Sequence, residues 1–317
     1  MKRVAWLLLA CSLPGLAQTY PARPVHIVVP YSTGGGTDLV ARAVGQKLAE
    51  RWGQPVLVDN KVGANGMIGA EAVAKSPADG YTLLMSTPAE VSTNPHLYAN
   101  ISYKADRDFA PITLITITPL VVAVNPGVAA KSVQELVALA KAKPGTLSYA
   151  TPGLGSAQHL TGEMIQAQAG IQLVHVPYKG AGQSIPDVIG GQVPVGIYGL
   201  LTINQQAKAG KIRVLAVTTP KRASTAPGLP TLAESGFPGF DTSLWFGLVA
   251  PAATPKEIIA KIHDDTVAVL RLPDVQERIA AQGGDIVGNT PAEFAAFIAA
   301  ESAKYAKIIR QAGVKLD

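Results

Sequence analysis

Two glycine-rich turns, one early in the chain and one near its middle, carry the residue types that bind anions. The first lies in a segment over residues 26–48 that reads HIVVPYSTGGGTDLVARAVGQKL, and the second lies over residues 147–166 and reads LSYATPGLGSAQHLTGEMIQ. In both, a β-branched or aromatic run meets glycines, and a hydroxyl residue then opens an apolar-periodic helix. Such a turn leaves backbone N–H groups unpaired at the positive end of a helix, where a carboxylate or phosphate binds. Two such turns in one chain predict a clamp for a small anion.

The first turn, Tyr31–Asp38, contains three consecutive glycines flanked by Ser32, Thr33 and Thr37. Small residues are needed where backbone N–H groups approach an anion closely. A tight turn with positive φ angles would need the same residues, so a purely structural role stays open. A P-loop would end in Gly-Lys-Ser/Thr, but Asp38 stands where that cation is required, and the spacing of a dinucleotide-binding fingerprint is absent. A nucleotide is therefore not the expected ligand.

The second turn, Thr151–His159, presents Gly153, Gly155 and Ser156 ahead of its helix. Ser156 is either a helix N-cap or a ligand contact, because a serine hydroxyl serves both purposes. His159 lies one turn into the helix, where it either donates to a carboxylate or covers the helix start. The residue types alone leave both alternatives open.

A third candidate segment, over residues 174–191, reads VHVPYKGAGQSIPDVIGG and interrupts a strand at Pro177. Tyr178 follows that proline and could present its ring and hydroxyl to a cleft. Lys179 has the features of a solvated loop lysine, and Asp187 is expected to cap or pair structurally. Only the tyrosine is expected to contribute to a ligand site.

Residues suited to metal binding or covalent catalysis are sparse. The histidines, at positions 26, 96, 159, 175 and 263, form no i,i+4 pair and no HExxH motif, so we expect no metal site. No Gly-x-Ser-x-Gly elbow is present, and Ser156 with His159 makes no triad without a further acid. The single cysteine, Cys11, lies in the N-terminal apolar run, so the mature chain is expected to have no disulfide. We therefore expect no cofactor and no enzymatic activity.

Charge and composition narrow the class of partner. The formal net charge is +5, and it falls to +3 without residues 1–17, which contain two cations and no acid. That balance suits an anionic ligand, but no Lys/Arg cluster marks a nucleic-acid surface. With 48% hydrophobic and 15% charged residues, the 317 residues can form one large or two smaller ordered domains.

The N-terminus has the layout of a secretory signal peptide. Lys2 and Arg3 precede an apolar run over residues 4–13, and Gly15-Leu16-Ala17 forms a small-x-small cleavage site. The run is shorter than the roughly 18 apolar residues of a membrane span, and no later stretch reaches that length. We expect residues 1–17 to be removed and the mature protein to be secreted. A lipoprotein anchored through Cys11, or a buried N-terminal element, is a less favoured alternative.

Apolar runs alternate with helical patterns along the chain, which is typical of βαβ units and mainly parallel sheets. An i+4 stripe from Val40 to Trp52 predicts the first helix, with Thr37 and Asp38 as capping types. Helices are also expected after the prolines at positions 255, 273 and 291. Strands are expected over residues 25–29, 56–58, 82–85, 112–115, 120–124, 147–149, 174–176, 195–198, 214–217 and 246–250.

An ordered series of segments over residues 20–315 resembles a known family. The series reads YPARPVHIVVPYSTGGGTD, VDNKVGANGMIGAEAVAKSPADGYTLL, NPHLY, DFAPIT, GLGSAQHLTGE, HVPYKG, DVIGGQVPV, LPTLAESG and WFGLVAPAATP. Together these segments resemble the Bug-type (TctC-like) periplasmic solute-binding proteins of tripartite tricarboxylate transporters. The resemblance implies a two-lobed α/β periplasmic-binding-protein fold, type II-like, with two mainly parallel sheets flanked by helices and a ligand cleft between the lobes. Lobe 1 would comprise residues 18–118 and 246–317, and lobe 2 residues 119–245.

The resemblance also implies a set of ligand-binding residues. Backbone amides of the first turn would bind a carboxylate, with Asp38 supporting the turn, and the second lobe would close on the other side. The implied residues are Tyr31, Ser32, Thr33, Gly34, Gly35, Gly36, Asp38, Ser86, Thr87, Thr151, Gly153, Gly155, Ser156, His159, Tyr178 and Tyr198.

Two departures from the family pattern bear on specificity. Residues 61–66 read KVGANG where the family commonly has a Pro-Gly-Ala-Gly-Gly loop, so a proline is lost and Asn65 is added. Tyr198-Gly199 stands where many members carry Phe-Asp, and losing that acid makes an amino-acid ligand less expected. A less acidic cleft with Tyr31, Tyr178 and Tyr198 nearby suits an aromatic or longer carboxylate.

We therefore expect a periplasmic, non-enzymatic solute-binding protein that closes on a di-, tri- or aromatic carboxylate and delivers it to a membrane transporter. We expect it to act as a monomer in transient contact with transporter subunits, with no cofactor and no nucleic-acid partner. One alternative is a sensor that presents the same solute to a signalling receptor. Another is a hydrolase that uses Ser156 and His159.

Overall fold

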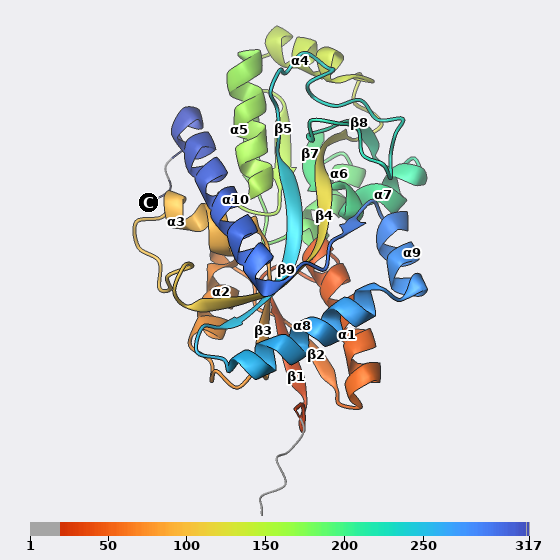
Figure 1. Cartoon of the computed structure of the whole chain (residues 1–317). Coiled ribbons are helices and arrows are strands. Elements are labelled where there is room, and N and C mark those ends of the chain that lie inside the picture. Colours follow the sequence, from red (N-terminus) through yellow and green to blue (C-terminus); the bar gives the residue numbers. More distant parts are fainter. Residues whose placement is uncertain (1–19, 315, 317) are drawn as a thin grey trace, which may run out of the picture.

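The computed structural model describes residues 20–314 and residue 316. The predicted signal peptide and Cys11 lie outside the described residues. Within them, ten strands are joined by hydrogen bonds: eight follow one another in the order β2-β1-β3-β9-β4-β7-β5-β6, and β8 and β10 pair with β4. Helices surround these strands (Figure 1), so the chain is an α/β protein, as the alternating pattern predicted.

The first three strands form a parallel set. β1 (Val25–Val29) pairs with both β2 (Val56–Asn60) and β3 (Thr82–Ser86), while α1 (Gly36–Trp52) and α2 (Met67–Ala74) connect them. The apolar runs of β1 and β3 are buried almost throughout. The predicted strands at 25–29, 56–58 and 82–85 are confirmed, and their carboxyl ends lead into the turns described below.

A second parallel set is formed by strands from the middle of the chain. β5 (Ser148–Thr151) pairs with β6 (Val174–Pro177) and with β7 (Val195–Gly199). The crossovers are α5 (Ala157–Ala169) and α6 (Ala181–Ile189). Each of these strands begins and ends within two residues of its predicted bounds, because β-branched runs and flanking glycines mark them locally.

Two long strands join the parallel sets. β4 (Phe109–Val124) pairs antiparallel with β9 (Ser243–Pro251) as far as Pro119, and from Leu120 onward it pairs antiparallel with β7 and with β8 (Arg213–Val217). β9 also pairs antiparallel with β3. Figure 1 shows β4 and β9 side by side through the centre of the molecule. The expectation of two mainly parallel sheets is therefore wrong, because β4 and β9 run antiparallel to every strand with which they pair.

The C-terminal segment is helical, as its prolines predicted. Pro255 is the N-cap of α8 (Lys256–Leu270), and prolines begin α9 (Pro273–Ala281) and α10 (Pro291–Ala312). The remaining elements are the 3-10 turn η1 (Ala64–Gly66), the π-helical turn η2 (Ala89–Thr93), α3 (Asn94–Leu97), α4 (Val133–Ala142), α7 (Leu200–Lys208) and β10 (Asp285–Ile286). Across residues 20–314, none of the helices has the length and apolar character that a membrane crossing requires.

Candidate functional site

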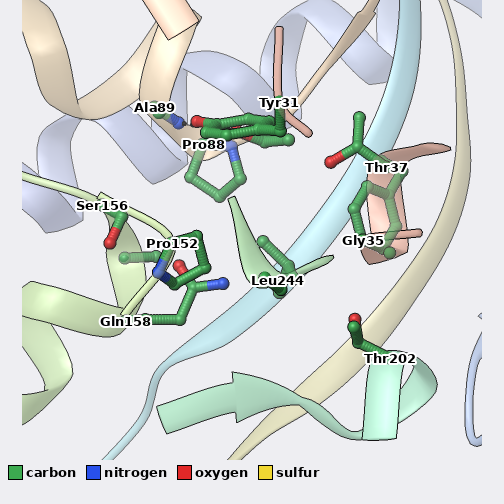
Figure 2. A pocket seen from close by; sticks show the side chains of 15 residues that line it. Tyr31, Gly35, Thr37, Pro88, Ala89, Pro152, Ser156, Gln158, Thr202 and Leu244 are labelled. Carbon is green, nitrogen blue, oxygen red and sulfur yellow. Dashed lines mark hydrogen bonds between the residues drawn. The ribbon is translucent and has the colours of Figure 1, made fainter. Parts of the chain in front are cut away.

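A cavity of about 30 Å³ lies where the two glycine turns meet. Figure 2 shows Gly35 and Thr37 on one side of it, and Ser156 and Gln158 on the opposite side. The cavity is lined by Tyr31, Gly35, Gly36, Thr37, Thr87, Pro88, Ala89, Pro152, Ser156, Ala157, Gln158, Ala181, Thr202, Leu244 and Phe246. The starts of α1 and α5, far apart in sequence, therefore converge on one cavity.

The start of α1 leaves backbone donors at the cavity wall. Its N-cap, Gly35, has extended backbone (φ −77°, ψ 168°) and makes no side-chain cap. The first helical bond runs from the Leu39 N–H to the Gly35 carbonyl at 3.0 Å. The N–H groups of Gly36 and Thr37 therefore precede any intrahelical partner. The prediction that Thr37 and Asp38 cap this helix is wrong.

Asp38 instead supports the turn from behind. Its buried carboxylate accepts from the Gly34 N–H at 2.9 Å, from Arg42 Nε at 3.0 Å and from Asn60 Nδ2 at 3.0 Å. Burial acts to raise the pKa of Asp38, but these hydrogen bonds outweigh it and hold the pKa below its usual range. Gly34 has φ 81°, a conformation that favours glycine, so Asp38 holds a turn that most residues could not form.

The start of α5 has a side-chain cap. Ser156 is the N-cap: its hydroxyl accepts from the His159 N–H at 3.2 Å and donates to the Gly153 carbonyl at 2.7 Å. The following N–H groups, of Ala157 and Gln158, precede any intrahelical partner, and both residues line the cavity. Ser156 thus caps the helix, as one alternative predicted, and also forms part of the cavity wall.

His159 lies behind the second turn and does not line the cavity. Its Nδ1 accepts from the Gly155 N–H at 3.1 Å, and its ring stacks on His175 with 4.1 Å between centroids. Burial lowers the pKa of His159, although Glu163, 3.7 Å from Nε2, acts in the opposite direction. A neutral imidazole is required for Nδ1 to accept, so burial and geometry agree. The ring supports the backbone of the turn.

The hydrolase alternative lacks a nucleophile–base pair in the structure. The Ser156 hydroxyl donates to a backbone carbonyl, and His159 Nδ1 is occupied by a backbone N–H. A serine nucleophile would need its hydroxyl bonded to the imidazole. Among the described residues there is also no group of three or more His, Cys, Asp or Glu side chains placed to hold a metal ion.

The first turn is in direct contact with the segment that follows β6. The Ser32 N–H donates to the Lys179 carbonyl at 3.1 Å. A Cβ added to Gly182 would lie 2.0 Å from the Thr33 carbonyl oxygen, and one added to Gly180 would lie 2.4 Å from Ser32 Oγ. Only glycine permits this approach, and the contact leaves little room inside the cavity. The structure therefore shows the first turn closed against the segment that links β6 to α6.

The residues implied by the family resemblance divide into two groups. Those that line the cavity are Tyr31, Gly35, Gly36, Thr87 and Ser156. Those that do not line it are Ser32, Thr33, Gly34, Asp38, Ser86, Thr151, Gly153, Gly155, His159, Tyr178 and Tyr198. Several members of the second group hold the walls in place; Ser86 Oγ, for example, donates to the Gly247 carbonyl at 3.0 Å.

Tyr178 and Tyr198 point away from this cavity. The Tyr178 hydroxyl donates to Asp187 Oδ2 at 2.5 Å, and burial together with Asp187 raises the pKa of Tyr178 to about 12. Tyr198 is fully buried, with its ring against Gly196. Of the three tyrosines expected near the solute, only Tyr31 lines this cavity.

Several lining residues carry no local sequence signal. Thr202, Leu244 and Phe246 come from α7 and β9, and only packing brings them to the cavity. Gln158 could have been predicted, because the second residue of a helix has an unpaired N–H wherever the helix start binds an anion. Thr37 was predicted only as a cap.

A buried carboxyl stands behind the wall residue Thr87. Glu90, in η2, is fully buried, and its Oε2 accepts from the Thr87 N–H at 2.7 Å and from the Thr87 hydroxyl at 2.9 Å. Glu90 Oε1 has no hydrogen-bond partner within the described residues. Burial raises the pKa of Glu90 to about 7, although the Thr87 hydrogen bonds act in the opposite direction. No local sequence pattern marks this residue.

Known proteins match this chain over most of its length and share its architecture. The family model described as the tripartite tricarboxylate transporter family receptor matches residues 40–314. The chain is 39% identical to BugT of Bordetella pertussis over 304 residues, which are 96% of this chain and 93% of BugT. The solved structure of the periplasmic binding protein BugD has a TM-score of 0.90 and 36% identity, covering 93% of this chain and 99% of BugD. Rpa4515 of R. palustris, solved with adipate, has a TM-score of 0.91 and 36% identity, covering 93% and 99%.

Proposed function

The chain belongs to the tripartite tricarboxylate transporter receptor family, and we propose that it captures a small carboxylate between its two glycine turns for delivery to a membrane transporter. As a member of that family it is a solute receptor and not an enzyme. The observation that carries the carboxylate assignment is the convergence of two helix N-termini on one cavity.

The cavity suits an anion whose charge is met by dipoles. None of its lining residues is Lys, Arg, Asp or Glu. Each helix start attracts an anion by about 0.3–1 kcal/mol at exposed sites, and by up to about 2 kcal/mol in partly buried ones. The N–H groups of Gly36, Thr37, Ala157 and Gln158 supply donors, and a carboxylate has about four acceptor positions to meet them. Adipate bound to Rpa4515 supports a dicarboxylate as the solute class.

Capture would require the turns to separate. The cavity of about 30 Å³ is far smaller than a ligand pocket, which usually measures about 300–1,000 Å³. β4 changes its partner from β9 to β7 between Pro119 and Leu120, which supports a hinge between lobe 1 (18–118 and 246–317) and lobe 2 (119–245). A carboxylate that touches both turns binds the closed arrangement more tightly than the open one, and it therefore shifts the protein toward closure.

The proposal places the mature protein in the periplasm, as a monomer that contacts transporter subunits transiently. BugD, a periplasmic binding protein with 36% identity, supports this location. The closed shape would be the form that the transporter recognises, since only closure distinguishes loaded from empty receptor. Thr87, Tyr31 and Ser156, which line the cavity, would orient the solute.

A thermal-shift screen of residues 18–317, freed of co-purified ligand, tests the proposal. The panel contains mono-, di- and tricarboxylates, aromatic acids, amino acids and inorganic phosphate. A ligand at 100 times its Kd adds about 2.7 kcal/mol, which should raise Tm by about 5–10 °C for a chain of this size. A shift from a dicarboxylate supports the assignment. If no carboxylate shifts Tm, the carboxylate assignment fails.

A further inference from the structure

A second cavity, of about 230 Å³, adjoins the carboxylate cavity. Tyr31 and Pro152 line both cavities, so they form a shared wall. The second cavity is otherwise enclosed by the 63–66 loop on one side and by the second glycine turn with Tyr178 and Lys179 on the other. It is several times larger than the first cavity and lies in the same contact region between the turns.

Asn65 places an unpaired acceptor at this second cavity. Its side chain is buried, with 9% exposure, and its Nδ2 donates to Asn94 Oδ1 at 2.8 Å. Asn94 Nδ2 in turn donates to the Asn65 backbone carbonyl at 3.0 Å. These two bonds determine the orientation of both amides, because a flip of either would set like groups against each other. Asn65 Oδ1 therefore faces away from Asn94.

No described residue donates to that oxygen. Asn65 Oδ1 has no hydrogen-bond partner. It faces Gly153, because a Cβ added to that glycine would lie 3.1 Å from Asn65 Oδ1. Gly153 and Asn65 both line the second cavity. A buried acceptor without a donor is costly, so natural proteins retain few of them and often at functional sites.

The backbone of the same loop is strained. Ala64 has φ 48° and Asn65 has φ 47°, two consecutive left-handed residues that are not glycine. Such strain persists where the surrounding structure requires it, commonly at ligand sites. The left-handed backbone of this loop and the unpaired Asn65 oxygen are two separate observations on adjacent groups.

We propose that the second cavity is the subsite for the distal part of the solute, and that Asn65 Oδ1 selects a carboxylic acid bearing a hydroxyl group. The inference rests on the proposed function, since it assumes that the carboxylate end occupies the first cavity. A hydroxyl would donate to Asn65 Oδ1 and remove the unpaired acceptor.

The charges around the subsite favour a hydroxyl over an ammonium group. No Asp or Glu lines either cavity, and Lys179 lines the second one. An ammonium group would therefore bring an unpaired charge beside a lysine and the positive start of α5. Glu90 stands behind Gly66: a Cβ on that glycine would lie 2.0 Å from Glu90 Oε1, so Gly66 separates this carboxyl from the cavity.

Calorimetric titration of residues 18–317 with matched acids tests the subsite. One series is succinate, each enantiomer of malate, and aspartate; the other is glutarate, each enantiomer of 2-hydroxyglutarate, and glutamate. We expect one hydroxylated enantiomer to bind about 5- to 10-fold more tightly than the plain diacid, as one good hydrogen bond provides. The amino acids should bind more weakly than the plain diacids.

The decisive variant is Asn65→Gly. Glycine accepts the left-handed backbone, so the loop can be kept while the acceptor is removed. The change also leaves Asn94 Oδ1 unpaired, but that effect weakens every acid alike and cancels from the ratio of affinities. The hydroxyl preference should fall below about twofold.

Leu154→Ala is the matched control, because it alters the same cavity without removing a polar atom. It should keep the hydroxyl preference of the natural chain. Equal binding of hydroxylated and plain acids by the natural chain would overturn the subsite while leaving the proposed function standing. An unchanged preference in Asn65→Gly would do the same. If no carboxylate binds at all, the proposed function fails and the subsite with it.

Discussion

Gly182→Ala is expected to prevent the first turn from closing fully against the start of α6, without harming the fold. The added Cβ would lie 2.0 Å from the Thr33 carbonyl oxygen and 3.2 Å from Ser32 Oγ. The first contact is with backbone, which cannot rotate away. Gly182 lies in the first turn of α6, where alanine favours the helix over glycine by up to about 1 kcal/mol. Any loss of affinity would therefore not come from a weaker helix.

The size of the effect follows from overpacking. An extra methyl group in a well-packed contact costs about 1–3 kcal/mol. If only the closed arrangement contains the clash, the binding-competent population falls by that amount, and the apparent Kd rises by about 5- to 150-fold. The unliganded protein can avoid the clash by opening, so its free energy of unfolding should change by less than about 0.5 kcal/mol.

Isothermal titration with the best dicarboxylate of the thermal-shift panel measures the apparent Kd. Urea unfolding without ligand measures the free energy of unfolding. Gly228→Ala is the matched control, because Gly228 has no atom within 4 Å of an added Cβ. The reasoning is refuted if Gly182→Ala binds as tightly as Gly228→Ala. It is also refuted if Gly182→Ala loses stability and affinity in equal measure, since the clash would then belong to the resting fold.

Three further variants address the walls of the site. Gly35→Val should lower the affinity for the carboxylate below detection by titration. A Cβ at this position already lies 3.4–3.7 Å from backbone atoms, and the branched methyl groups of valine would fill the cavity. Unchanged affinity would show that the first turn is not part of the site. Glu90→Gln should abolish a pH dependence of stability. The pKa of Glu90 is raised from 4.5 to about 7, so between these pH values the folded natural chain holds a proton that the unfolded chain loses. The free energy of unfolding of the natural chain should therefore fall by about 3 kcal/mol from pH 4.5 to pH 7, relative to the variant. An equal change in both proteins, measured by urea unfolding at the two pH values, would contradict this. Ser156→Ala should cost about 1 kcal/mol in urea unfolding through loss of the α5 N-cap, and a stability equal to that of the natural chain would show that the cap contributes nothing.

Local features of the chain were sufficient to predict much of the fold. β1 was predicted at its observed bounds, and Pro273 and Pro291 begin helices as expected. Both glycine turns were recognised because a strand run, glycines and a cap residue lie within a few positions of one another. Ser156 caps α5 for the same reason. These signals depend only on backbone conformation and on periodicity along one segment, so they need no knowledge of the rest of the molecule.

Strand direction and the identity of the cavity walls required the tertiary structure. An apolar run such as Leu120–Val124 has the same pattern whether its neighbours are parallel or antiparallel, and only its pairing with β7 and β8 decides the direction. Tyr178 could have faced the cavity, but its hydroxyl bonds to Asp187. Whether a polar atom finds a partner, as Asn65 Oδ1 does not, depends on groups distant in sequence. The sequence by itself therefore determined the two glycine-rich turns, while packing decided which residues line the cavity beside them.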